Sequence, residues 1–133
     1  MVADYKHQRV TPIMWNCDGA AIVAGTTTTF ACGSVSAAES RITVPVPRDG
    51  IVRNMTCYIN APAGLGETVT FTFRLAFGNT LLTVTIGGAV DQQGDDMVNA
   101  VAVAKDDLID IMVVTSVACA AVRVSVGFDF IPS

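Results

Sequence analysis

The sequence is poor in the residues that carry most enzyme chemistry. Its 133 residues include a single histidine, His7, and only 15% are charged, whereas soluble domains usually have roughly 25%. A Ser/His/Asp triad needs a histidine beside its nucleophile, and His7 lies within the first ten residues, far from most of the chain. The sequence therefore predicts a protein that is not an enzyme and needs no cofactor.

Positive charge and long apolar segments are scarce as well. The formal net charge is −4, so the basic footprint of a nucleic-acid-binding protein is missing. Residues 19–38 are uncharged, but they contain a threonine run, two serines and three glycines, which argues against a membrane span. The start MVADYKHQRV has no apolar core of a secretory signal. We expect no nucleic-acid or membrane partner, and synthesis in a cytoplasm.

No metal-binding pattern occurs. The four cysteines at positions 17, 32, 57 and 119 are widely spaced and include no CxxC pair, so a zinc site is not expected. Two disulfides are possible by number, but a cytoplasmic origin favours free thiols. Asp91, Asp95 and Asp96 are oxygen donors for calcium without EF-hand spacing, and we expect a solvated loop there.

The strongest positive signal is alternation in residues 68–77, TVTFTFRLAF. Phe71, Phe73, Leu75 and Phe77 fall on one face, and threonines, Arg74 and Ala76 fall on the other, as in a half-buried strand. The Gly78-Asn79 pair separates this run from TLLTVTI at 80–86. Because both residues tolerate positive φ, a hairpin with its turn at this pair is predicted.

Further strands follow the same reasoning, and no segment has a helical stripe. Alternating or β-branched runs are found at residues 20–24, 27–32, 51–60, 97–104, 108–116 and 121–130. Residues 41–47, RITVPVP, read as an edge segment because proline cannot donate to a ladder. Residues 34–40 and 61–67 read as loops. The predicted fold is an all-β antiparallel sandwich of about eight short strands.

The first residues lack strand periodicity, which predicts an extended N-terminal arm at 1–18 before a sandwich domain at 19–133. The arm carries the basic residues Lys6, His7 and Arg9, as well as Tyr5 and the only tryptophan, Trp15. A basic segment on an acidic body favours docking to an acidic partner. These five residues are the candidate partner-binding site.

The apolar content indicates where other contacts are expected. Hydrophobic residues make up 51% of the chain, and subunit interfaces are one place for the excess, a compact monomer being the alternative. The threonine-rich outer faces of residues 68–76 and 80–86 suit an interface without buried charge. Arg53, Arg74 and Arg123 are expected to pair with Asp110 or Asp129, within one chain or across subunits.

Residues 41–130 resemble the small jelly-roll domains of phage virion proteins, found in head decoration proteins and fibre knobs. The segments that carry the resemblance are GIVRNM at 50–55 and AKDDLI at 104–109. The chain is also similar to the trimeric heads of tumour necrosis factor and complement C1q. Only a short arm, and no collagen-like Gly-X-Y stalk, precedes the domain, which favours a small virion subunit over a surface filament.

This resemblance implies a jelly-roll-like sandwich and a homotrimer located in the virion. The expected function is that of a capsid decoration or cement subunit, whose partner is the major capsid protein or another virion protein. The alternative is a fibre or spike knob that binds a host receptor or glycan. A knob predicts exposed aromatic residues, and the body of the chain offers only Tyr58 for this role.

Overall fold

A computed structural model describes residues 10–17 and 19–133 of the chain. This part consists of ten β-strands and one short 3-10 helix, η2 (Glu39–Arg41). The strands are β1 (Thr11–Asn16), β2 (Thr27–Ala31), β3 (Ser34–Ser36), β4 (Val44–Pro45), β5 (Gly50–Ile59), β6 (Gly64–Leu75), β7 (Gly78–Gly88), β8 (Gln93–Val103), β9 (Leu108–Thr115) and β10 (Val124–Pro132). No helix in the described part is long and apolar enough to cross a membrane. The predicted all-β fold class is confirmed.

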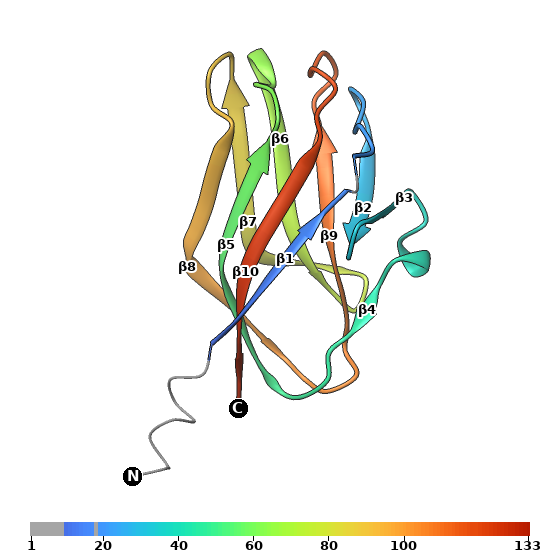
Figure 1. The fold of residues 1–133 in the computed structure, drawn as a ribbon, viewed down its shortest axis with the longest axis vertical. Helices are drawn as coiled ribbons and strands as arrows, with labels where there is room; N and C mark the ends of the chain where they lie inside the picture. Colours follow the sequence, from blue (N-terminus) through green and yellow to red (C-terminus); the bar gives the residue numbers. More distant parts are fainter. Residues whose placement is uncertain (1–9, 18) are drawn as a thin grey trace.

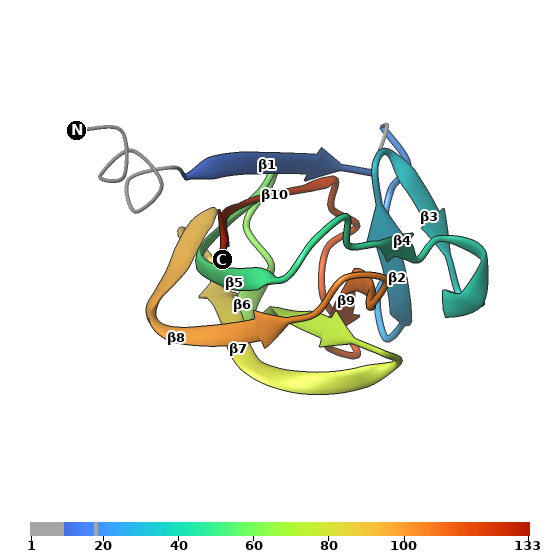
Figure 2. The ribbon, with the colours of Figure 1, turned by 90° about the horizontal axis from the view of Figure 1, so that it is seen from below.

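The strands form two antiparallel sheets that pack face to face (Figure 1). One sheet has the order β1-β10-β5-β8, and the other has the order β3-β2-β9-β6-β7, with β4 pairing with β9. Figure 2 shows β8 of the first sheet beside β7 of the second, while β1 lies at the far edge of its sheet. The sandwich thus has a β7–β8 side and an opposite side where β1 faces β4 and β2.

The core forms where the apolar faces of the two sheets meet. Phe71 and Phe73 of β6 are fully buried, and Val126 and Phe128 of β10 are almost fully buried. The rings of Phe73 and Phe128 meet edge to face, with centroids 5.6 Å apart. Burying one such side chain stabilises the fold by roughly 1.5–3 kcal/mol. The apolar faces predicted for β6 and β10 are therefore those that hold the sandwich together.

The hairpin turn lies closer to the N-terminus than predicted. Leu75 pairs with Gly78, so the turn residues are Ala76 and Phe77, with φ of 49° and 65°, and Gly78-Asn79 belong to β7. A register shift after Thr72 moves the turn in this direction. The prediction failed because sequence pattern alone does not reveal a β-bulge. Phe77 consequently leaves the apolar face and is exposed.

Strand structure begins earlier in the chain than predicted. β1 runs antiparallel to β10 in an unbroken register from Thr11↔Phe130 to Asn16↔Ser125. The boundary expected at residue 18 is therefore corrected, because residues 11–16 belong to the sandwich. Tyr5, Lys6, His7 and Arg9, the remaining members of the predicted arm site, lie outside the described residues.

Three segments differ from their predicted type. Residues 20–24 form only an isolated bridge, Ile22↔Val122, instead of a strand. The expected loops at 34–40 and 61–67 contain β3 and the first residues of β6. β3 pairs with β2, and the start of β6 pairs with the end of β7. Long-range pairing overrides local composition in these segments, and the described chain has ten strands instead of about eight.

Candidate interaction site

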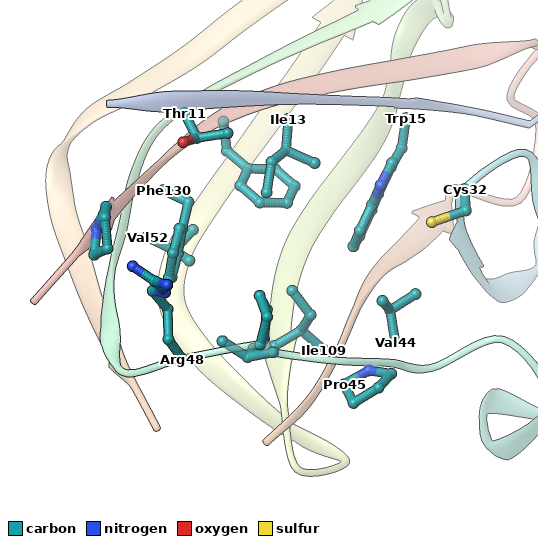
Figure 3. Close-up of a pocket in the computed structure, with 14 residues that line it drawn as sticks. Thr11, Ile13, Trp15, Cys32, Val44, Pro45, Arg48, Val52, Ile109 and Phe130 are labelled. Atoms are coloured by element: carbon teal, nitrogen blue, oxygen red, sulfur yellow. The ribbon is translucent and has the colours of Figure 1, made fainter. Parts of the chain in front are cut away.

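A cavity of about 410 Å³ opens between the two sheets on the side where β1 faces β4. Figure 3 shows Ile13 and Trp15 pointing from β1 toward Val44 and Pro45 on the other wall. The alternation of β1 explains this wall, because Ile13 and Trp15 point inward while Met14 points to solvent. We call this cavity the slot. Its volume lies within the range of roughly 300–1,000 Å³ typical of small-molecule sites.

Trp15 is a wall of the slot and a member of the core. Its side chain is 8% exposed, and its ring meets Phe128 edge to face with centroids 5.1 Å apart. The sequence placed Trp15 in a free arm as a partner anchor. In the structure it is fixed inside its own sandwich, where it forms part of the inner wall of the slot.

Of the described residues that line the slot, one is charged, namely Arg48. Arg48 is exposed at one end of the slot, and its side chain has no hydrogen bond or ion pair with the described residues. Cys32 lines the other end and is the one exposed thiol, since Cys17, Cys57 and Cys119 are buried. All four cysteines are free. Sequence reasoning did not identify Arg48 as a site residue.

A second feature is an exposed apolar patch on the β7–β8 side, which we call the rim patch: Leu81, Met97 and Val98. Their exposed fractions are 79%, 54% and 91%. Two consecutive apolar side chains are exposed on β8 because Asp96 interrupts the alternation. Its carboxylate accepts hydrogen bonds from the backbone N–H groups of Val98 and Asn99, both at 3.0 Å.

The Asp96 carboxylate also joins the two sheets, because it accepts a hydrogen bond of 3.2 Å from the backbone N–H of Thr83 on β7. Burial raises the pKa of Asp96, but hydrogen bonds from Asn99, Val98 and Thr83 outweigh this effect and lower it to about 2. Asp96 is therefore a structural carboxylate, charged at neutral pH, that holds the rim patch in place. No group of three His, Cys, Asp or Glu side chains among the described residues is arranged to hold a metal ion.

A third feature is a hollow on the outer face of the four-stranded sheet, which we call the sheet hollow: Met14, Thr56, Tyr58 and Gly127. Met14↔Gly127↔Thr56 are register partners across three strands. Gly127 leaves a dip between side chains because it has no Cβ, and the hollow has a volume of about 360 Å³. Met14 is 79% exposed and Tyr58 is 45% exposed, so apolar surface lines the hollow.

The threonine face expected from the sequence is present on the outside of the six-stranded sheet. Thr70 and Thr85 are opposite each other in β6 and β7, and their hydroxyl oxygens are 3.2 Å apart. Thr83 and Leu81 extend this face along β7. The face is uncharged along this stretch, and it adjoins the rim patch through Leu81.

Within the described part of one chain, the arginines do not form ion pairs with Asp110 or Asp129. Arg74 forms a salt bridge of 2.8 Å with Glu39 of η2. Arg123 donates to the carbonyl of Gly19 at 2.7 Å. Asp129 instead accepts a hydrogen bond of 2.9 Å from Asn54. Strand register alone pointed to the wrong partners, because η2 folds over the outer face and brings Glu39 to Arg74.

Comparison with known proteins does not assign a family. No protein-family model matches the chain, and no curated protein matches it. The slot, the rim patch and the sheet hollow are therefore interpreted from their own chemistry.

Proposed function

We propose that the protein is a structural virion subunit, a capsid decoration or cement protein that binds the capsid surface as a homotrimer. The observation that supports this most is the separation of the rim patch from the sheet hollow. Both expose apolar side chains, and they lie on different faces of the sandwich. Exposed apolar patches of this kind mark interaction sites.

Two different patches on one chain favour a heterologous contact, in which the rim patch of one copy packs into the sheet hollow of the next. Such head-to-tail contacts close into a ring when the rotation between copies permits it. Val98, at 91% exposure, is the protruding element, and the dip over Gly127 is the receiving element. A ring of three copies agrees with the trimeric heads that residues 41–130 resemble.

The contact with the capsid is assigned to the basic N-terminal residues Lys6, His7 and Arg9, together with Tyr5. The chain enters the sandwich at Thr11, opposite Phe130 near the end of β10. Residues 1–9 precede all strands of the described part, so an arm here gains contact area without disturbing the sandwich. Its positive charges make the attachment sensitive to salt, because exposed charges are screened over roughly 8 Å at physiological ionic strength.

The test is a variant lacking residues 1–9, mixed with undecorated capsids of the parent virus. The deletion stops at residue 9 because a longer one, of residues 1–15, would also remove Trp15 and most of β1. We expect the shortened protein to remain folded and trimeric and to lose capsid binding. A control, Lys105→Gln, removes an exposed positive charge from the body and should bind normally. Capsid binding by the shortened protein at the level of the full chain would contradict the assignment.

The alternative function is a fibre or spike knob that binds a host receptor or glycan. The observation in its favour is Tyr58, an aromatic ring exposed in the sheet hollow beside Gln93 and Ser125. If the hollow is covered in the trimer, Tyr58 is unavailable for a receptor. Copy number in purified particles separates the two functions, since decoration proteins occur in hundreds of copies and knobs in few.

A further inference from the structure

The slot is independent of the surfaces used in the proposed function. Its walls are the inward faces of β1 and β10 and the segment 44–48. Strands β7 and β8, which carry the rim patch, lie on the side of the sandwich opposite β1 and β4 (Figure 2). The side chains of the sheet hollow and those of the slot alternate along β1, with Met14 on the outer face and Ile13 on the inner face.

The wall of the slot opposite β1 is the segment that leads from β4 to β5. Val44 and Pro45 pair with β9, and Val46 is held by backbone hydrogen bonds with Asp106 and Asp107. Val44 and Pro45 of this segment face Ile13 and Trp15 across the slot (Figure 3), and Pro47 also lines it. Among the described residues, the walls are mostly apolar and include no acidic side chain.

The chemistry of the slot changes at the Arg48 end. A guanidinium presents five N–H donors in a planar fork that suits a carboxylate, and that of Arg48 is unpaired among the described residues. Figure 3 shows the Arg48 side chain extending beside Phe130, at the end of the slot away from Cys32. An apolar groove with one cation at its end is complementary to an amphiphile with an apolar chain and an anionic end.

We infer that the slot binds a long-chain carboxylate of the fatty-acid type. The chain lies between Trp15 and Val44, and the carboxylate meets the guanidinium of Arg48. The charge of Arg48 selects a carboxylate over a neutral alcohol of equal length, and the apolar walls select a long chain over acetate.

The fluorescence of Trp15 is a direct reporter, because it is the only tryptophan in the chain and lines the slot. The full-length protein is titrated with dodecanoate, dodecanol and acetate, each below any micelle concentration. We expect a saturable change with dodecanoate, a weaker affinity for dodecanol and no response to acetate. Absence of saturable dodecanoate binding would overturn the inference, and so would equal affinity for dodecanoate and dodecanol.

Two variants locate the ligand. Arg48→Gln changes an exposed residue and should weaken dodecanoate binding by about fivefold or more, since a charge-assisted contact is lost, with dodecanol binding unchanged. Arg53→Gln is the matched control, because Arg53 is also exposed but lies on the outer face of β5, outside the slot. An equal loss of dodecanoate affinity in both variants would mean that only general charge attraction is involved, and it would overturn the inference.

A second readout uses Cys32 at the other end of the slot. Bound dodecanoate should slow alkylation of Cys32 in the folded protein, and Val44→Phe, which narrows the slot, should abolish this protection. The melting temperature of Val44→Phe is compared with that of the parent chain to confirm that it folds. Unchanged alkylation of Cys32 at saturating dodecanoate would place the ligand outside the slot and overturn the inference.

Discussion

Asp110 lies directly opposite Arg74 in the register of β9 and β6, yet neither of its carboxylate oxygens accepts a hydrogen bond from a residue of the described part. The guanidinium of Arg74 instead contacts Glu39, at 2.8 Å, and donates to the carbonyl of Phe77 at 2.7 Å. Asp110 is completely buried. Its burial and the nearby negative charge of Glu39 raise its pKa to about 7, although Arg74 lowers it.

This arrangement predicts that the protein loses stability as the pH rises from about 4 to about 7. Asp110 keeps its proton in the folded state up to about pH 7, whereas in the unfolded chain it ionises near pH 4. Between these values the folded state binds more protons, so the free energy of unfolding falls with pH. One pKa unit corresponds to about 1.4 kcal/mol, which sets an upper limit of about 4 kcal/mol.

The measurement is urea unfolding of the parent chain and of Asp110→Asn across this range. We expect Asp110→Asn to be nearly independent of pH between 4 and 7 and more stable than the parent at pH 8. Asp96 gives the opposite slope, but only below its unfolded pKa near pH 4, so the two effects occur in separate windows. Asp95→Asn, at an exposed position of β8, is the control. If the free energy of unfolding changed with pH in the same way in the parent and in Asp110→Asn, Asp110 would not be the source of the pH dependence.

In the proposed trimer, Val98→Asp is expected to separate the subunits without unfolding the chain. Val98 is 91% exposed in the rim patch, so a charge costs little in the free chain but is buried unpaired in the interface. Val117→Asp is the matched control, because Val117 is the same residue type, is 88% exposed and lies outside both patches. Size-exclusion chromatography with circular dichroism provides the readout. Dissociation of both variants, or of neither, would argue against the rim patch as the contact between subunits.

The four cysteines are expected to differ in reactivity while all remain reduced. Burial raises the pKa of Cys57 above its usual range, and burial together with Glu67 raises that of Cys119. Because the thiolate is the reactive form, a short exposure of the folded protein to alkylating agent should modify Cys32 alone. Under denaturing, non-reducing conditions, the intact mass should show four adducts. Two adducts or none would indicate disulfides.

A change of the two turn residues between β6 and β7 is expected to stabilise the protein. Ala76 and Phe77 both have positive φ, which costs roughly 1–2 kcal/mol for an ordinary L-residue. The double change Ala76→Asn, Phe77→Gly introduces the preferred pair for such a turn and should raise the free energy of unfolding by about 1 kcal/mol. Thr83→Gly, within β7, should lower it instead. If the Asn-Gly pair lowered the free energy of unfolding, the Phe77 side chain would contribute more to stability than its exposed position indicates.

The sequence predicted the parts of the fold whose signal is local. β6, β7 and β10 alternate strongly, so their buried faces were found from period alone. β1 was missed because Met14, an apolar residue on the outer face, hides the alternation of Ile13 and Trp15. The rim patch was missed as well. Met97 and Val98 are both exposed because Asp96 interrupts the alternation of β8, and the sequence pattern does not show this interruption.

The slot had no local signal that could identify it. The two prolines of residues 41–47 indicated an edge, but Arg48, Trp15 and Phe130 come to line one cavity only through the packing of three distant segments. The Arg74–Glu39 pair was missed for the same reason. The 3-10 helix that carries Glu39 lies in a stretch predicted to be a loop, and strand periodicity says nothing about how such a stretch folds over a sheet.

Self-assembly through the rim patch and the sheet hollow is best tested by light scattering on the isolated full-length protein at micromolar concentration. We expect a molar mass about three times the 13.9 kDa of one chain. A mass equal to that of one chain would contradict it, because the rim patch and the sheet hollow would then remain uncovered in solution.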